Sequence, residues 1–303
     1  MPLFRRSDAD LVTDLGDSRR IMPYVMRGRN ESVVFHSMQV KVSETRAWLR
    51  EFNRARGNQQ PHATLFHLLI YVCSRVFGER PGMNRFISGG RTYQRREVSV
   101  SFAAKKRFVE NSPLITLKLK FPSVEPFEKC VERICDAVEN GRTGSGAPID
   151  AELRLLLRLP GPILRVVIAA GRWLDRFNLM PAALMEPDPL FSTIFLTHDG
   201  SVGIRNATHH LYEYGSCGMH GVMGSLQKAV VVDRSGHTSV QEVVEVNWSF
   251  DERINDGFCS ADTLTAIQRM MEDPGRYIVT PDLTATSGGE SAGQSRKYAA
   301  SSE

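Results

Sequence analysis

The sequence has no uninterrupted apolar stretch long enough to cross a membrane. Its most apolar part, residues 149–186, falls short of the ~20 clean residues that a spanning helix needs. The interruptions are Arg158, Pro160, Gly161, Pro162 and Arg165. The N-terminus "MPLFRRSDADLVTDL" also lacks the apolar run of about 7–15 residues that marks a secretory signal. We therefore expect a cytoplasmic protein, with the membrane surface as the alternative location.

Cysteine frameworks, metal-ligand spacings and basic runs are absent as well. The five cysteines are an odd number without framework spacing, which is typical of a reducing compartment. No H-x-E, C-x-x-C or carboxylate cluster occurs, so we expect no metal. The formal charge is +4, from 38 basic and 34 acidic residues. The sequence has no basic run, so a nucleic-acid partner is not expected. This mild surplus suits anionic small molecules or a membrane surface.

What the chain does contain is enough apolar material for a core, since 42% of its 303 residues are hydrophobic. Residues 1–17 are interpreted as a flexible N-terminal arm, and 18–280 as the folded domain. The Ser-, Gly- and Ala-rich residues 281–303 are expected to be disordered.

Strand and helix periodicities alternate along the folded part. Period-two alternation predicts strands over 33–42, 97–102 and 114–121, and strands are also expected near 191–197, 228–233 and 242–250. Helical spacing predicts helices over 43–57, 61–78, 125–140 and 260–272, and 61–78 is apolar nearly all round, as a central helix would be. The mixture predicts an α+β fold in which helices pack against one large sheet.

The apolar segment 149–186 predicts two short helices broken at "LPGP". Its arginines form a basic edge: Arg154, Arg158, Arg165, Arg172 and Arg176. One interpretation is a helical pair packed on the sheet with a solvated arginine face. The other is an interfacial hairpin that contacts lipid at a membrane surface.

Charged residues gather where the strand in "VEVNWSFDERINDGF", residues 243–257, ends in a polar turn. Asp251, Glu252, Arg253 and Asp256 follow a strand whose alternate residues are apolar. Gly257 then lets the backbone enter a helix. The pattern indicates charged side chains on rigid supports at a strand end.

Four segments, in this order, together resemble the catalytic domain of the dihydrolipoyl acyltransferases of 2-oxo acid dehydrogenase complexes, relatives of chloramphenicol acetyltransferase. "SFDERINDGFCSADTL" is similar to the family signature S-[FY]-D-H-R-x-x-D-G-A, with Glu252 in place of the His. "DPLFSTIFLTHDGSVGI" resembles its F-T-I-S-x-L-G-x-x-G loop and strand. "HATLFHLLIYVCSRVFGERPGMNRFI" is similar to its buried helix, and "SRRIMPYVMRGRNESVVFHSMQVKV" to its opening arginine-led segment.

The resemblance implies a chloramphenicol acetyltransferase-like mixed sheet flanked by helices, with the active site at a trimer interface. It assigns the oxyanion contact to Thr197, the structural carboxylate to Asp256, and that carboxylate's partner to Arg19 or Arg20. Glu252 falls at the position of the base, and Arg253 and Gly257 support the site. The substrate would be a coenzyme A thioester and the assembly a homotrimer or a multiple of trimers. No lipoyl group is expected on this chain, which begins almost at the domain itself.

A glutamate is a weak base for a thiol. Proton transfer from a thiol of pKa near 8.5 to an ordinary carboxylate near 4.3 is uphill by about 4 units, or ~6 kcal/mol. A dry environment raises a carboxylate's pKa by about 3–5 units, which would remove this deficit. A salt bridge from Arg253 to Glu252 would have the opposite effect.

Other histidines are weaker candidates for the base. His209 and His210 in "HHLYEYG" imitate a catalytic pattern, but they precede the final strand. His198 adjoins Thr197 and should point to the opposite face of its strand. His36 is expected to be a hydrogen-bonded core residue.

Two classes of function follow. The first is a coenzyme A-dependent acyltransferase that moves an acyl group to an unidentified small-molecule acceptor, with hydrolysis of the thioester as a variant. The alternative is a catalytically inactive homologue that serves as a trimeric scaffold, or as a binding module that contacts lipid through 149–186.

Overall fold

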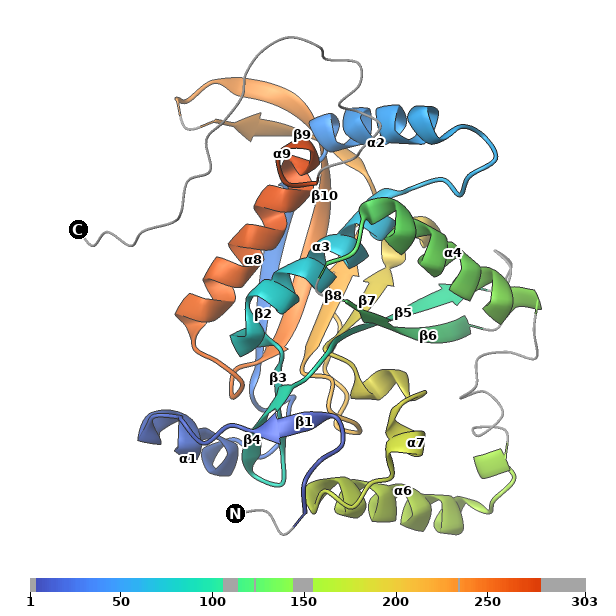
Figure 1. Cartoon of the computed structure of the whole chain (residues 1–303). Helices are drawn as coiled ribbons and strands as arrows, with labels where there is room; N and C mark the ends of the chain where they lie inside the picture. Colours follow the sequence, from blue (N-terminus) through green and yellow to red (C-terminus); the bar gives the residue numbers. More distant parts are fainter. Residues whose placement is uncertain (1–3, 106–113, 123, 144–154, 234, 279–303) are drawn as a thin grey trace.

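A computed structural model describes residues 4–105, 114–122, 124–143, 155–233 and 235–278. The α+β class predicted above is confirmed, since helices lie against a mixed sheet (Figure 1). The strands are β1 (Ala9–Leu11), β2 (Val33–Lys41), β3 (Arg85–Ser88), β4 (Arg91–Arg95), β5 (Val98–Lys105), β6 (Leu114–Phe121), β7 (Ile194–His198), β8 (Met219–Met223), β9 (Gln227–Val232) and β10 (Thr238–Asp251). The α-helices are α1 (Asp17–Val25), α2 (Ser43–Arg56), α3 (Leu65–Glu79), α4 (Phe127–Thr143), α6 (Gly161–Arg176), α7 (Ala182–Met185), α8 (Gly257–Glu272) and α9 (Pro274–Tyr277).

The large sheet has the strand order β2-β10-β8-β7-β5-β6, and β9 also pairs with β10. β5 and β7 are parallel, as are β7 and β8, and the other pairs are antiparallel. β10 is the longest strand and pairs with three neighbours. Its C-terminal end, at Asp251, carries the charged turn.

Helices α2, α3, α4 and α8 cover one face of this sheet and build the main core against it (Figure 1). α3 is the central helix, and nine of its residues are buried, as its all-round apolar sequence predicts. In the middle of the sheet the buried Trp248 lies over Gly221. A Cβ at Gly221 would be 2.8 Å from the indole ring, so the small residue makes room for the large one.

The N-terminal residues depart from the expected flexible arm. β1 pairs with β4 in a small sheet, β1-β4-β3, and Ala9 is buried. The Arg6 guanidinium is also buried and pairs with Asp8 at 2.8 Å and with Asp175 at 2.6 Å. This partner is 169 residues away in the chain, which is why local composition did not reveal the contact.

The apolar segment 149–186 packs differently from the helical pair expected on the sheet. α6 begins within the "LPGP" break, as predicted, but no α6 residue is buried. Its exposed apolar side chains include Ile163, Val166 and Trp173. In Figure 1 α6 lies beyond the small sheet, away from the large one. The expected helix before "LPGP" lies largely outside the described residues, as does the tail 281–303. Among the helices of the described part, none is long and apolar enough to span a bilayer.

Candidate active site

The charged turn after β10 is fixed by a buried ion pair between Asp251 and Arg253. The Arg253 Nη2 lies 2.7 Å from Asp251 Oδ2 and its Nε 2.8 Å from Oδ1, and the two side chains are 4% and 1% exposed. Ser32 Oγ also donates to Asp251 Oδ1 at 3.0 Å. Arg253 Nη1 donates to the carbonyls of Met26 and Arg27. The pair therefore joins the strand end to the segment after α1.

Glu252 is not tied to Arg253, which was one of the alternatives open from the sequence. Its side chain is half-buried, and among the described residues its carboxylate has no ion pair. The backbone is well held: Glu252 N–H donates to Ser32 O at 2.9 Å, and Arg19 Nη1 donates to the carbonyls of Glu252 and Asn255 at 3.0 Å each. A carboxylate with no cation partner is thus presented on a rigid turn.

Asp256 and Gly257 lie where the turn enters α8, and Arg20 lies on α1. Asp256 is the N-cap of α8, and its Oδ1 accepts the Cys259 N–H at 2.8 Å. α8 therefore begins at Gly257, three residues before the helix start expected from the sequence. The expected partnership of Asp256 with Arg19 or Arg20 does not occur among the ion pairs of the described residues. Arg19 holds the turn through carbonyls instead, and Arg20 pairs with Asp17 at 3.5 Å in solvent.

Thr197 lies near the end of β7 and contacts a histidine that the sequence analysis did not single out. Its Oγ1 is 2.9 Å from His220 Nε2 on β8. His220 is 2% exposed, and burial lowers its pKa to about 3, so the ring is neutral at physiological pH. A neutral imidazole has one donor and one acceptor nitrogen. The tautomer with the proton on Nε2 donates to Thr197 and leaves the threonine proton free for an oxyanion.

Stacked rings surround this contact on the face of the sheet opposite the helices. His209 stacks on His220 with centroids 4.1 Å apart, and His210 stacks on His209 at 4.5 Å. His198 points to the other face, where it stacks on Phe66 of α3. Among the described residues, no group of three or more His, Cys, Asp or Glu side chains is arranged to hold a metal ion.

His36, expected in the core, is exposed on β2. His36 pairs in register with the buried Trp248 on β10. The helices do not cover this end of β2, which is an edge strand, so His36 stays exposed. The alternation of β2 was predicted, but the extent of helix coverage was not visible in it.

The buried His220 and the half-buried His67 predict an acid-sensitive fold. Below about pH 6.5 the unfolded chain protonates its histidines, while folded His220 stays neutral down to about pH 3. Lowering the pH through this window should therefore reduce the free energy of unfolding, and His220 contributes up to ~1.4 kcal/mol per pH unit to this loss. His67, whose pKa burial lowers to about 4, acts in the same direction.

Denaturant titrations at about pH 7 and about pH 5 test this prediction. His220→Gln should reduce the pH dependence, and His36→Gln, an exposed control, should leave it unchanged. Equal slopes in His220→Gln and the unmodified protein would contradict the assignment.

One chain does not bring Thr197 and Glu252 together. In the sheet register, Thr197 is level with Val222 on β8 and, through it, with Asn247 on β10. Glu252 lies five residues further along the chain and two strands away, so the two positions are separated by roughly 15–20 Å. Any reaction that uses both side chains needs them from different copies.

A second feature near the end of β7 is a cavity of about 670 Å³ between α2, α3 and the turn after β7. His198 and Gly200 line it, together with three arginines from successive turns of α2: Arg46, Arg50 and Arg54. Arg46 pairs with Glu242. Among the described residues, Arg50 and Arg54 have no ion pair, so the cavity is open to an anionic ligand.

Comparison with known proteins places both candidate residues within one matched region. Residues 187–279 match the sequence model described as 2-oxoacid dehydrogenases acyltransferase (catalytic domain). No curated protein matches the chain.

Solved structures show that the likeness extends over most of the chain. A probable dihydrolipoamide acetyltransferase from Listeria monocytogenes 4b F2365 is 15% identical, with 87% of this chain and 95% of that chain covered and a TM-score of 0.58. The dihydrolipoamide acetyltransferase of Azotobacter vinelandii is 12% identical, with 85% of this chain and 90% of that chain covered and a TM-score of 0.57. A chloramphenicol acetyltransferase is 11% identical, with 88% of this chain and 98% of that chain covered and a TM-score of 0.51. The chain therefore has the fold of these acetyltransferases, and its residues 187–279 carry the sequence pattern of the 2-oxoacid dehydrogenase acyltransferase catalytic domain.

Proposed function

We propose that the protein is a coenzyme A-dependent acyltransferase in which Glu252 is the general base and Thr197 the oxyanion donor. The observation that carries this proposal is that the Glu252 carboxylate has no ion pair among the described residues although Arg253 is its neighbour. The neighbouring guanidinium is engaged by Asp251, so the Glu252 carboxylate is free to accept a proton while its backbone is held rigidly. Water-free surroundings make such a carboxylate a stronger base.

Assembly would supply those surroundings. The distance between Thr197 and Glu252 within one chain supports a site built between copies, in a homotrimer or a multiple of trimers. The helix-free face of the sheet also displays an exposed aromatic, Phe35, which pairs in register with Ser249. Phe258, at the start of α8, is 86% exposed. Exposed aromatics of this kind are typical of surfaces that another protein covers.

The cavity beside α2 is suited to the thioester substrate. Coenzyme A carries several phosphate charges and an adenine ring. Arg50 and Arg54 offer guanidinium groups that are unpaired within the described residues for the phosphates, and the Phe66–His198 stack offers a ring surface. The cavity lies on the helix-covered face at the end of β7, whereas the Thr197 side chain points to the other face, so the pantetheine arm would pass the end of β7 to bring the thioester carbonyl to Thr197.

Removing these charges should weaken coenzyme A binding. We expect the double substitution Arg50→Gln, Arg54→Gln to raise the dissociation constant on the order of tenfold or more, because charge-assisted contacts to phosphate are lost. Isothermal titration calorimetry at two ionic strengths is the measurement, since exposed contacts weaken with salt. Arg20→Gln is the exposed control. Unchanged affinity in the double variant would rule out this cavity as the coenzyme A site.

The exposed apolar side chains of α6 favour a second candidate, an inactive homologue that acts as a scaffold or a membrane-surface module. The replacement of the signature histidine by Glu252 is consistent with a homologue that has lost catalytic activity. This candidate predicts no thiol release from any acyl-coenzyme A, together with recruitment to lipid vesicles. Turnover that depends on Glu252 would exclude its inactive form.

A further inference from the structure

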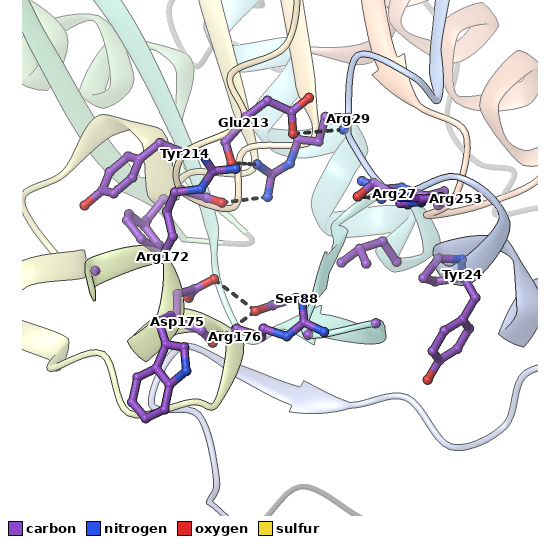
Figure 2. Close-up of a pocket in the computed structure, with 18 residues that line it drawn as sticks. Tyr24, Arg27, Arg29, Ser88, Arg172, Asp175, Arg176, Glu213, Tyr214 and Arg253 are labelled. Carbon is purple, nitrogen blue, oxygen red and sulfur yellow. Dashed lines mark hydrogen bonds between the residues drawn. The ribbon is translucent and has the colours of Figure 1, made fainter. Parts of the chain in front are cut away.

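A second cavity, of about 540 Å³, lies between α6, the β3–β4 hairpin and the segment after α1 (Figure 2). Five arginines line it: Arg27, Arg29, Arg172, Arg176 and Arg253. Arg172 and Arg176 reach it from α6, while Arg27 and Arg253 lie on the opposite wall. Only two acidic side chains, Asp175 and Glu213, are among the lining residues.

The acidic groups are already engaged. Asp175 pairs with Arg6, and Arg253 pairs with Asp251. Glu213 accepts the backbone N–H groups of Arg29 at 3.2 Å and Asn30 at 3.0 Å. Among the described residues, no ion pair or hydrogen bond involves the guanidinium groups of Arg27, Arg172 and Arg176, although the Arg27 backbone contacts Glu31 and Arg253. The cavity therefore has an excess of positive charge.

Arg29 is a separate indication of an anion. It is 6% exposed, and its guanidinium donates to the carbonyls of Tyr212, Glu213 and Gly215 at 2.9, 3.1 and 2.6 Å. No carboxylate lies within ion-pair distance of it in the described structure, and its buried Nε has no partner there. Burial lowers the Arg29 pKa and outweighs the opposing effect of Asp251, which reflects the cost of a buried charge that its neighbours compensate only in part. An anion in the cavity would offset that cost.

The α6 wall of the cavity is fixed. Ser88 Oγ donates to Asp175 Oδ2 at 2.9 Å and to the Asp175 carbonyl at 3.1 Å. Gly89, with a φ of 57°, approaches α6 so closely that a Cβ there would be 2.3 Å from the Arg176 carbonyl oxygen. The arginines of α6 are thus carried on a helix docked to the hairpin.

We propose that this cavity binds the phosphate group of a small phosphate ester or of an acidic lipid headgroup. Guanidinium groups bind phosphate through paired hydrogen bonds, and three of them without a partner in the described part of the chain match a dianion better than a single carboxylate. Tyr24 and Tyr214, which also line the cavity, provide ring surface for the rest of the ligand. α6 lies outside the matched residues 187–279, and the proposal does not depend on acyl transfer.

The test is calorimetric titration of the full chain with phenyl phosphate, and with benzoate as the carboxylate counterpart. Arg172→Gln, Arg176→Gln should weaken phenyl phosphate binding by about tenfold or more. The matched control is Arg158→Gln, Arg165→Gln, which removes the same charge from exposed arginines of the same segment outside the cavity. The control should bind as the unmodified protein does, and benzoate should bind more weakly than phenyl phosphate.

Vesicle flotation separates the two sources of phosphate. If phosphatidylcholine vesicles containing phosphatidic acid recruit the protein, and Arg172→Gln, Arg176→Gln abolishes recruitment while the control does not, the ligand is a lipid headgroup. Phenyl phosphate binding with the same arginine dependence, but without recruitment, identifies a soluble ester. The proposal is overturned if the unmodified protein binds neither probe, or if variant and control lose binding equally.

Discussion

Arg253→Ala is expected to lower the free energy of unfolding by about 3–5 kcal/mol, because it leaves the carboxylate of Asp251 buried without its cation. Desolvating a charge is costly, and the pair offsets that cost only while both members are present. The guanidinium also satisfies the carbonyls of Met26 and Arg27, which would lose their donor. Urea unfolding followed by circular dichroism measures the effect.

A double-mutant cycle distinguishes a broken pair from general damage. Asp251→Asn combined with Arg253→Gln should cost less than the two single changes added together, since neither charge is then left alone. Arg20→Ala, which removes an exposed pair with Asp17, should change stability by less than about 1 kcal/mol. A loss below about 1 kcal/mol for Arg253→Ala would show that the pair does not hold the turn.

Glu252→Gln is expected to reduce thiol release from acyl-coenzyme A by about 10²–10⁴-fold, the usual contribution of a positioned general base. The amide keeps the size of the side chain but cannot accept the proton. Thr197→Val should cost about 10²–10³-fold through the lost oxyanion contact. Glu252→Gln should keep the unfolding free energy within about 1 kcal/mol, because this side chain is outside the main core. Thr197→Val should lower it by about 1–3 kcal/mol, because the buried His220 Nε2 loses its hydrogen-bond partner.

Glu245→Gln is the matched control for the base, since Glu245 is a half-buried glutamate on β10, the strand that leads into the Glu252 turn. Its turnover should equal that of the unmodified protein across a panel of acyl-coenzyme A chain lengths. If Glu252→Ala is as active as the unmodified protein while Glu252→His is more active, Glu252 is not the base.

The large sheet was predictable where apolar and polar residues alternate along its strands, as in β5 and β6. In β5 both faces are buried, and its inward-facing polar residues are serines. β8 was not predicted, because Met219–Met223 is five residues long and follows Gly218. Its period-two pattern of Met219, Gly221 and Met223 against His220 was the available signal. The contact of His220 with Thr197 depends on the pairing of β7 with β8, which is a tertiary property.

The partner of Arg253 follows from the turn that ends β10. The Arg253 backbone N–H donates to Asp251 Oδ1 at 3.1 Å, and this local contact places the guanidinium beside Asp251 and not beside Glu252. The arginine cavity, in contrast, draws on Arg27, Arg176 and Glu213, which are far apart in the chain. No local sequence pattern predicts that these three side chains line the same cavity. The position of α6 was missed for the same reason, because its anchors, Ser88 and Gly89, belong to a distant hairpin.

Mixed oligomers test most directly whether the site is completed between copies. Thr197→Val and Glu252→Gln chains, each nearly inactive alone, would be co-expressed in equal amounts and the acyl-coenzyme A turnover measured. In a ring with head-to-tail contacts, about one interface in four then joins an intact Glu252 to an intact Thr197. A site completed between copies should therefore recover roughly a quarter of the unmodified activity. Recovery of none, with mixed oligomers demonstrated, would contradict it.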